Sequence, residues 1–371
     1  MTLDAAAPAR TAGTVRVVGS GLLGASAGLA LSLRGVDVVL SDSSPTQAAL
    51  ARDLGAGRLA AEGDEPSLVL VATPPDVVAE VVVAELAAHP GAVVTDVASV
   101  KGGPLAALRA AGADLRRYVG GHPMAGRERG GAVSARADLF AGRPWVVAAT
   151  EAADPAAVAR VHDLAVDCGG VPVAMPAAEH DEAVALVSHA PQVAASLVAA
   201  RLRGAPEPAV RLAGQGLRDV TRIAGSDPVL WAQILAANAG PVADVLEELR
   251  TDLDAVVGAL RALQADPTAP GARGRLAQLI AAGGAGRERI PGKHGGAPAL
   301  YATVVVVVPD RPGALARLLA DVGEAGVNLE DLRLEHSPGQ AVALAAVDVL
   351  PAAAARLAEA LRARGWTVPA S

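Results

Sequence analysis

The stretch VRVVGSGLLG, Val15–Gly24, decides the fold of the N-terminal part of this chain. Four β-rich residues lead into glycines with the spacing Gly19-x-Gly21-x-x-Gly24, and an Ala- and Leu-rich helix follows to about Arg34. In such a loop the first glycine makes a tight turn, the second lets the backbone approach a pyrophosphate, and the third lets helix and strand pack closely. The helix start adds free N–H groups and a partial positive charge. Placed between a strand and a helix, the pattern predicts a dinucleotide-binding loop rather than an ordinary turn.

Strand and helix patterns alternate through residues 1–171. A second apolar run, Val36–Ser41, ends at Asp42, and Ala-, Leu- and Val-rich helical segments separate the later strand candidates. These candidates are Ser67–Val71, Ala92–Thr95, Arg116–Val119 and Trp145–Ala149. Such alternation predicts an α/β fold with a parallel, doubly wound sheet, the Rossmann arrangement, over residues 1–171.

The rest of the chain follows two other patterns. From about Pro172 the segments are mainly helical, which predicts an all-helical domain over residues 172–282. A Gly- and Pro-rich stretch, residues 283–299, is expected to be a linker. Residues 300–371 follow the order strand, helix, strand, strand, helix, which predicts a small α+β domain of βαββα type.

Composition restricts the class of protein. The formal net charge is -7 and no basic run stands out, which disfavours nucleic-acid binding. Cys168 is the only cysteine, so neither an internal disulfide nor a cysteine metal cluster is expected, and no other metal-ligand spacing occurs. We see no signal-peptide pattern at the N-terminus and no uninterrupted apolar run approaching the ~20 residues of a membrane span. These observations predict a soluble, cytoplasmic protein without a membrane segment.

Asp42 is the residue that favours one cofactor over another. It lies 18 residues beyond Gly24, at the end of the second strand, where its carboxylate would accept hydrogen bonds from adenosine ribose hydroxyls and repel a 2′-phosphate. NAD is therefore predicted rather than NADP; a helix cap or a plain surface acid is the alternative. Ligands bind at the carboxyl ends of such strands. The predicted cofactor contacts are Gly19, Gly21, Leu22, Leu23, Gly24, Asp42, Thr73, Pro74 and Asp96.

The stretch GGHPMAG, Gly120–Gly126, places one histidine in a Gly- and Pro-rich loop after a strand. Imidazole titrates near pH ~6.5 and accepts a proton at neutral pH. Oxidation of an alcohol by hydride transfer needs such an acceptor, so His122 is a candidate general base, or else hydrogen-bonds its own loop. Ser99 and Lys101 follow the fourth strand candidate. Either they contact the substrate, or Ser99 caps the next helix and Lys101 is solvated.

Five segments together resemble the prephenate dehydrogenases, with the arogenate dehydrogenases as close relatives. They are GSGLLG (Gly19–Gly24), VTDVASVK (Val94–Lys101), GGHPMAGRERGG (Gly120–Gly131), LVSHAPQ (Leu186–Gln192) and LRDVTRIAGSDPVLW (Leu217–Trp231). They come in the family's order across roughly residues 15–240. The combination is specific, because the histidine loop and the RDVTRIA segment rarely occur together elsewhere.

The resemblance implies oxidative decarboxylation of prephenate by NAD, giving 4-hydroxyphenylpyruvate, the precursor of tyrosine. His122 would take the proton of the ring hydroxyl, and Ser99 would contact that hydroxyl or the histidine. Arg222 would bind a substrate carboxylate, unless it only pairs with Asp219 on its own helix. The other predicted substrate-binding residues are His189, Gln192, Lys101 and Glu128.

Several residues in or near the predicted site carry open questions. Many family members have histidine where this chain has Gln192, which can hydrogen-bond but cannot carry a charge. Pro191 predicts a kink beside His189. Glu128 either helps to gate the site or is solvated. His180 and Asp181 are either a paired acid and base or, as we favour, capping or surface residues.

The C-terminal module looks like an ACT domain, on the segments Asp310–Leu315 and Gly326–Asn328. Such domains commonly bind amino acids, so tyrosine is the expected effector, near Pro312, Gly313, Ala314 and Asn328. A homodimer is a further expectation from the family. The alternatives are an arogenate dehydrogenase, a β-hydroxyacid dehydrogenase, which would usually need a lysine in the helical domain, and a non-catalytic amino-acid sensor.

Overall fold

The computed structural model describes residues 8–126, 130–291, 301–336 and 341–369. By its internal contacts the chain divides into two units. The first comprises Met1–Gly204 and Val220–Leu249, and the second comprises Ala205–Asp219 and Arg250–Ser371. The predicted nucleotide-binding and catalytic residues with described positions all lie in the first unit.

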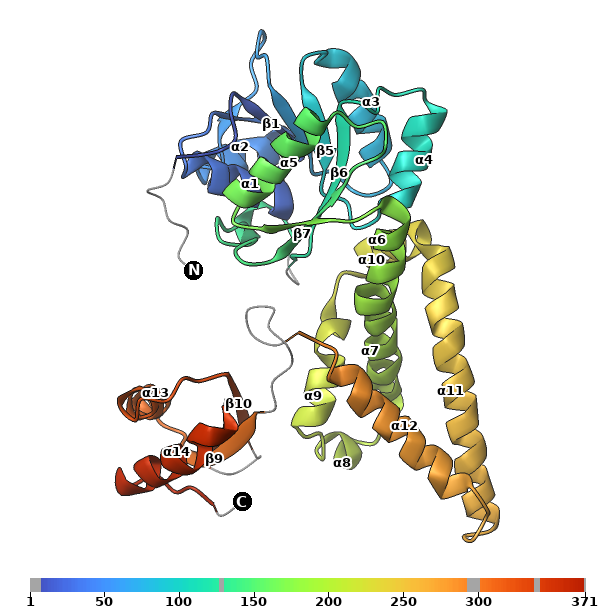
Figure 1. Ribbon diagram of the computed structural model, residues 1–371, viewed down its shortest axis with the longest axis vertical. Helices are drawn as coiled ribbons and strands as arrows, with labels where there is room; N and C mark the ends of the chain where they lie inside the picture. Colours follow the sequence, from blue (N-terminus) through green and yellow to red (C-terminus); the bar gives the residue numbers. More distant parts are fainter. Residues whose placement is uncertain (1–7, 127–129, 292–300, 337–340, 370–371) are drawn as a thin grey trace. The chain divides into compact units, whose positions relative to one another are not determined.

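The first unit is built on an eight-stranded sheet with the order β3-β2-β1-β4-β5-β6-β7-β8 (Figure 1). Neighbouring strands are parallel except β6 and β7, which are antiparallel. The predicted doubly wound α/β fold is confirmed, with an antiparallel junction that the sequence analysis did not predict. The strands are β1 (Val15–Val18), β2 (Val38–Ser41), β3 (Arg58–Leu59), β4 (Leu68–Val71), β5 (Val93–Asp96), β6 (Tyr118–Pro123), β7 (Pro144–Ala148) and β8 (Val171–Ala174).

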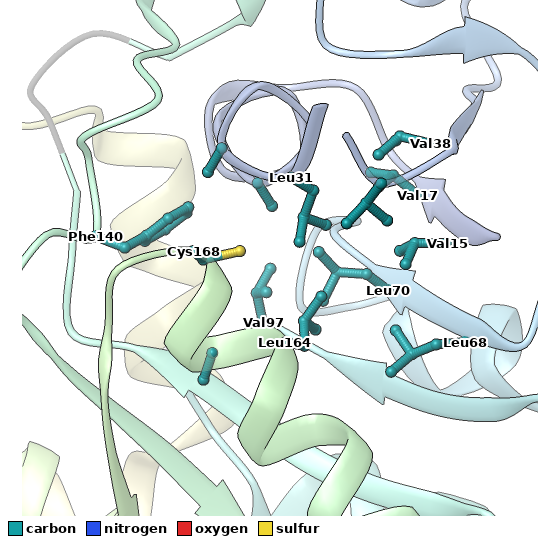
Figure 2. Packing of buried hydrophobic residues seen from close by; sticks show 14 of the residues in the cluster. Val15, Val17, Leu31, Val38, Leu68, Leu70, Val97, Phe140, Leu164 and Cys168 are labelled. Atoms are coloured by element: carbon teal, nitrogen blue, oxygen red, sulfur yellow. The ribbon is translucent and has the colours of Figure 1, made fainter. Parts of the chain in front are cut away.

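Helices cover both faces of the sheet because successive strand residues point to opposite faces. Leu68 and Leu70 pack in one buried cluster, and Val69 and Val71 pack in another. Figure 2 shows the first cluster, where Leu31 and Leu164 meet the strand residues from two helices. That face carries α1 (Leu22–Ser32), α2 (Pro45–Asp53) and α5 (Pro155–Asp167), and the other carries α3 (Val78–Ala88) and α4 (Gly102–Ala110).

Strand β6 differs from the prediction in a way that matters for the site. It runs through His122 to Pro123, so this histidine stands on a strand and not in the loop that was predicted. The glycines before it serve close packing. A Cβ atom on Gly121 would lie 2.5 Å from the carbonyl oxygen of Asp96, and one on Gly120 would lie 3.1 Å from the Lys101 side chain. Strand β8 lies beyond Val171, where strands were no longer expected.

The helices that follow β8 begin with one long, interrupted helix. It consists of α6 (Ala177–Val184), a π-helical turn (Ala185–His189) and α7 (Ala190–Arg201). The π turn ends just before Pro191, whose ring cannot fit a regular helix, so a distortion beside His189 is present. Short 3-10 turns occur at Ala132–Ser134, Leu202–Gly204 and Arg222–Gly225. Between α10 (Pro228–Ala237) and α11 (Ala239–Ala265) the chain bends by 95°.

The second unit contains the expected small α+β domain. Its order is β9 (Ala302–Pro309), α13 (Ala314–Glu324), β10 (Asp331–His336), β11 (Val342–Val349) and α14 (Pro351–Ala363), which confirms the βαββα prediction. The strands form an antiparallel sheet in the order β10-β11-β9, and both helices contribute to its buried core. The unit also holds α8 (Glu207–Val210), most of α9 (Gln215–Thr221) and α12 (Ala272–Arg287). Helix α12 therefore continues past residue 283, where the linker was expected to begin.

Candidate active site

The carboxyl ends of four adjacent parallel strands bring the predicted site residues to one edge of the sheet. Strands β1, β4, β5 and β6 are neighbours in that order. Gly19 directly follows β1, Thr73 lies just beyond β4, Ser99 lies just beyond β5, and His122 is near the end of β6. Because ligands of open α/β sheets bind at this edge, the topology alone gathers a nucleotide loop, two hydroxyls and an imidazole.

The glycine loop has the geometry that a pyrophosphate requires. Gly19 has φ +97°, and a Cβ atom on Gly24 would lie 1.9 Å from the Gly19 carbonyl oxygen. By contrast, a Cβ atom on Gly21 would meet nothing within 4 Å, so the space above it is open. Helix α1 has no side-chain cap and no acidic residue in its first turn. Its first N–H groups can therefore hold an anion, while Leu22 and Leu23 pack against the core.

Asp42 joins the glycine loop to the loop after β2. Its Oδ2 accepts a hydrogen bond from the Ser20 N–H at 2.6 Å, and its Oδ1 accepts one from the Ser44 N–H at 2.8 Å. The cap of α2 is Ser44, so Asp42 is not the residue that caps this helix. The carboxylate is half-buried at the end of β2, where a ribose would lie.

Thr73 presents an unused polar group at the same edge. Its Oγ1 is buried and has no hydrogen-bond partner within the described residues. A buried hydroxyl without a partner is costly, and a bound ligand would satisfy it. Pro74 beside it is exposed. The glycine loop, Asp42 and Thr73 therefore fit a dinucleotide.

Asp96 and Lys101 form a buried ion pair beneath the site, which corrects the roles predicted for them. Both side chains are at most 1% exposed. The carboxylate of Asp96 accepts from Lys101 Nζ, from the Ala98 N–H and from the Tyr118 hydroxyl, and Lys101 Nζ also donates to the Gly121 carbonyl at 2.6 Å. Burial lowers the pKa of Lys101, while the charge of Asp96 opposes that shift. Both side chains are engaged with partners in the interior, and the alternative of a solvated lysine is wrong.

This ion pair instead positions the strand that carries the histidine. Lys101 follows β5 and holds the backbone of β6 at Gly121, one residue before His122. A charge pair that is fully buried and fully hydrogen-bonded fixes the separation and register of the two strands. The lysine thus acts on the site through the backbone.

His122 belongs to a hydrogen-bonded chain with His180 and Asp181. The Nδ1 atom of His122 lies 2.8 Å from Nε2 of His180, and Nδ1 of His180 lies 2.8 Å from Oδ1 of Asp181. His180 is fully buried and Asp181 is 7% exposed. The preference for a surface role for these two residues is therefore wrong. Asp181 does cap a helix, but the helix is α4 and not its own.

The direction of these hydrogen bonds fixes which nitrogen of His122 is free. An ionised carboxylate only accepts, so His180 Nδ1 carries the proton and its Nε2 is an acceptor. His122 must then donate from Nδ1, which leaves Nε2 of His122 unprotonated. Burial, together with the nearby His180, Lys101 and His189, lowers the pKa of His122 well below 6.5. The imidazole is therefore neutral at pH 7 with one lone pair available.

Ser99 does not cap the following helix. The start of α4 is capped by Asp181, which accepts from the Lys101 N–H at 2.8 Å and from the Gly102 N–H at 2.7 Å. The Ser99 side chain is half-buried, and within the described residues its hydroxyl makes no hydrogen bond. It remains available to a ligand at the edge of the sheet.

His189 is held in the opposite tautomer by Asn238. The amide of Asn238 donates to the Asp181 carbonyl at 2.8 Å, which fixes its orientation, and the same nitrogen lies 3.1 Å from Nδ1 of His189. Nδ1 of His189 therefore accepts, and its proton is on Nε2. Burial lowers the pKa of His189, which keeps it neutral. The ring is 1% exposed and packs edge-on against Trp231.

The remaining predicted substrate residues differ in their environment. Gln192 is 6% exposed, and its Oε1 accepts a long hydrogen bond of 3.5 Å from the Ser226 hydroxyl. Arg222 is exposed and has no ion-pair partner within the described residues, and Asp219 instead accepts from Gln215. The predicted alternative of an Asp219–Arg222 pair does not form. Glu128 lies outside the described residues.

The residues predicted to bind an effector lie at the start of α13 and before β10. Gly313 has φ +84° and precedes the helix, with Pro312 exposed and Ala314 buried. Asn328 is exposed, and its amide donates to Glu330 at 2.6 Å. Among the described residues, no group of three or more His, Cys, Asp or Glu side chains is placed to hold a metal ion.

Four residues of the site were not assigned to it from the sequence. The pair His180-Asp181 was considered but not favoured, and Tyr118 and Asn238 carry no motif. The sequence does contain one hint of the role of His180 and Asp181, which is that a histidine stands beside an aspartate at the start of an apolar helix. Its partner His122 is 58 residues away in the chain, so only the fold brings them together.

Comparison with known proteins agrees with the fold and with the family resemblance. Residues 27–174 match the family model of the prephenate dehydrogenase nucleotide-binding domain, and residues 176–269 match that of the prephenate dehydrogenase dimerization domain. A probable prephenate dehydrogenase from Streptomyces niveus, NovF, is 40% identical over 301 residues, which are 80% of this chain and 83% of that protein.

Two solved structures are similar to this chain. One is prephenate dehydrogenase from A. aeolicus in complex with hydroxyphenyl propionate and NAD+, with TM-score 0.65 and 26% identity, covering 75% of this chain and 98% of that one. The other is Synechocystis arogenate dehydrogenase, with TM-score 0.62 and 26% identity. That likeness covers 74% of this chain and 99% of the Synechocystis chain. From its motifs, its fold and these matches, the chain belongs to the prephenate dehydrogenase family.

Proposed function

We propose that this protein catalyses the NAD-dependent oxidative decarboxylation of prephenate to 4-hydroxyphenylpyruvate. The observation that carries the proposal is His122, a neutral imidazole with a free Nε2 at the sheet edge that also carries the glycine loop. The NAD+ bound to the A. aeolicus relative supports the choice of cofactor. Asp42 at the end of β2 supports NAD over NADP, because its charge would repel a 2′-phosphate.

The cofactor would be held by the glycine loop, Asp42 and Thr73. When bound, NAD supplies the acceptor for the hydride that leaves the ring carbinol carbon. His122 Nε2 takes the hydroxyl proton as the carbon–oxygen double bond forms. Loss of the ring carboxylate as carbon dioxide then makes the ring aromatic, and the proton on His122 returns to the phenolate oxygen. The base is thereby regenerated without proton exchange with solvent.

The other predicted contacts bind and orient the substrate. Ser99 would hydrogen-bond the ring hydroxyl, because its own hydroxyl makes no hydrogen bond within the described residues. Arg222, exposed and unpaired there, would form a two-point, charge-assisted pair with a carboxylate. His189 and Gln192 would supply neutral hydrogen bonds, with His189 donating from Nε2. Glu128, which lies outside the described residues, stays a prediction from the sequence.

Formation of NADH tests this function directly. Absorbance of NADH is followed with prephenate or arogenate as substrate and NAD or NADP as cofactor. Turnover of prephenate with NAD supports the proposal. Preference for arogenate would support the second candidate, which the likeness to the Synechocystis enzyme keeps open. No turnover of either substrate would overturn the proposal and leave a β-hydroxyacid dehydrogenase or a non-catalytic sensor as the alternatives.

We also propose that the protein is a cytoplasmic homodimer. Large apolar side chains are exposed along the segment matched by the dimerization model, including Leu186, Val187, Leu197, Leu253 and Leu260. The stretch Ala177–Gly204 is long and apolar enough to pass as a membrane span by length and composition, which the sequence analysis did not expect. However, it carries the buried polar residues His180, Asp181, His189 and Gln192. A partner protein surface suits its exposed residues better than lipid.

Binding of tyrosine to the C-terminal domain remains a separate proposal. The supporting observations are its βαββα order and the glycine turn at Gly313 before α13. Calorimetric titration of the full-length protein with tyrosine measures this binding. Asn328→Leu should weaken it, whereas an unchanged affinity would place the ligand elsewhere.

A further inference from the structure

We propose that His180 and Asp181 are positioning residues that hold His122 in the tautomer able to accept a proton. The chain of contacts runs from the Asp181 carboxylate through His180 to Nδ1 of His122, with both heavy-atom distances at 2.8 Å. This inference rests on the proposed function, because it assigns the two residues to the base of that reaction. Neither residue is expected to touch the substrate.

Asp181 is anchored by the start of α4. Its carboxylate accepts hydrogen bonds from the Lys101 and Gly102 N–H groups, two donors that a helix start leaves unsatisfied. Burial alone would raise the pKa of Asp181, but the bonds from His180 and these two N–H groups hold it below its usual value. The carboxylate is therefore ionised at pH 7 and can only accept from His180.

Gly102 provides the room for this anchor. A Cβ atom at position 102 would lie 2.8 Å from Oδ2 of Asp181, whereas one at Gly103 would meet nothing within 4 Å. A side chain at residue 102 would therefore force the carboxylate from α6 to shift from its present position. This neighbouring pair of glycines is a matched test of the anchor.

The consequence is a fixed direction of proton donation along the chain. With Asp181 ionised, His180 donates from Nδ1 and accepts at Nε2, so His122 donates from Nδ1 and accepts at Nε2. When His122 gains the substrate proton, its Nδ1–H bond to His180 strengthens and the new charge faces a chain that ends in a carboxylate. His180 is fully buried, so the chain orients and stabilises His122 and has no exit to water.

Two substitutions of His180 separate its contacts. In His180→Gln the side-chain oxygen can still accept from Nδ1 of His122. In His180→Asn the shorter amide can reach Asp181 but not His122. We expect His180→Asn to lower kcat by about 10²- to 10⁴-fold, the range for a base in the wrong tautomer. His180→Gln should retain at least tenfold more activity than His180→Asn, and NADH affinity should be unchanged in both.

Nitrogen NMR of ¹⁵N-histidine-labelled protein measures the tautomer itself. The His122 signals are assigned by their loss in His122→Asn. In the unaltered protein His122 should be protonated at Nδ1, and in His180→Asn a substantial Nε2-protonated fraction should appear. A residue that merely supported the fold would change stability without moving this tautomer.

The glycine pair tests the anchor even if the His180 variants fail to fold. Gly102→Ala should lower kcat at least tenfold, because it displaces Asp181, while Gly103→Ala should keep full kcat. Both gain helix propensity, and thermal denaturation of the two variants shows whether a loss of stability accompanies any difference in kcat.

The outcomes distinguish this inference from the proposed function. Suppose that prephenate is oxidised and that His122→Asn is inactive. The positioning role is then overturned if His180→Asn and Gly102→Ala keep full kcat and His122 stays protonated at Nδ1 in both variants. If the unaltered protein does not oxidise prephenate or arogenate, the proposed function fails. The ¹⁵N measurement then still decides whether His180 sets the tautomer of His122.

Discussion

His122 and His180 lie 2.8 Å apart, nitrogen to nitrogen, although one stands on strand β6 and the other on helix α6. The base at the sheet edge is therefore assembled from two segments that each belong to a different family model. Its protonation depends on how α6 packs against the sheet. Catalysis and the packing of these helices are coupled through this one contact.

The half-buried position of His122 beside other basic side chains predicts an unusual pH dependence. Only neutral His122 accepts a proton, and its pKa lies well below 6.5, so kcat/KM for prephenate should stay high as the pH falls through 6.5. The decline should come only at lower pH. Measurement of kcat/KM against pH checks this, and an acid limb centred at or above 6.5 would contradict the burial of this ring.

The same burial should make stability depend on pH. The folded-state pKa values of His122 and His189 are lowered, so below pH ~6.5 the unfolded chain binds protons that the folded chain does not. The stabilisation from these groups is fully present above the pKa of histidine in the unfolded chain. It is lost as the pH falls toward the pKa values of His122 and His189 in the folded protein. We would measure denaturant unfolding at pH 7.5 and at pH 5.5, about a unit above and below the pKa of histidine in the unfolded chain. The free energy of unfolding should be lower at pH 5.5.

Arg222→Ala should weaken substrate binding and leave the fold intact. Arg222 is exposed and unpaired within the described residues, so removing it breaks no structural ion pair. We expect kcat/KM to fall about tenfold or more, ~1.4 kcal/mol, mainly through a higher KM, because the charge-assisted pair with the substrate carboxylate is lost. Arg222→Lys should recover part of it, because lysine keeps the charge but not the two-point geometry. Arg218→Ala, an exposed arginine on α9, is the control. Unfolding of the Arg222→Ala protein would point to a structural role instead.

Two glycine substitutions should separate folding from cofactor binding. In Gly24→Ala the new Cβ would lie 1.9 Å from a backbone oxygen, so both the fold of the loop and NAD binding should fail. In Gly21→Ala the protein offers open space, so thermal stability should be kept while NAD affinity falls about tenfold or more, ~1.4 kcal/mol. Thermal denaturation and titration with NADH measure the two effects. Unchanged NADH affinity in Gly21→Ala would place the pyrophosphate elsewhere.

Lys101→Met should reduce stability and leave KM for prephenate unchanged. The lysine is 1% exposed and paired with Asp96, and breaking such a buried pair costs about 3–5 kcal/mol. The double variant Lys101→Met with Asp96→Asn should recover part of this loss, because no unpaired charge is then left buried. Denaturant unfolding gives these values. A raised KM at full stability would restore the substrate contact first predicted for this lysine.

The fold of the sheet domain could be predicted from the sequence, because it is specified by patterns within short segments of the chain. The glycine spacing after Val15–Val18 and the alternation of apolar runs with helices specify the doubly wound arrangement without knowledge of distant contacts. The antiparallel pairing of β6 with β7 was missed, since strand direction depends on the connection between strands and not on their composition. His122 was assigned to a loop because glycines weaken a strand signal, although here they allow β6 to approach β5 closely.

Residue type alone was enough to pick out His122 and the glycine loop as candidates for one site. His122 and the glycine loop lie at the same sheet edge, as expected. Asp96 and Lys101 were misassigned because a charged residue after a strand looks the same whether it faces a ligand or a buried partner. His180 and Asp181 were undervalued for a related reason, since their importance comes from a contact across 58 residues.

The most direct test of the central claim is the turnover of prephenate with NAD by the unaltered protein and by His122→Asn, measured as NADH formation at saturating substrate. His162→Asn, which changes an exposed histidine on α5, is the control. The account predicts that His122→Asn binds NADH and prephenate normally but has kcat reduced by about 10²- to 10⁴-fold, with the control unaffected. Full kcat in His122→Asn would show that another group accepts the proton and would contradict the account.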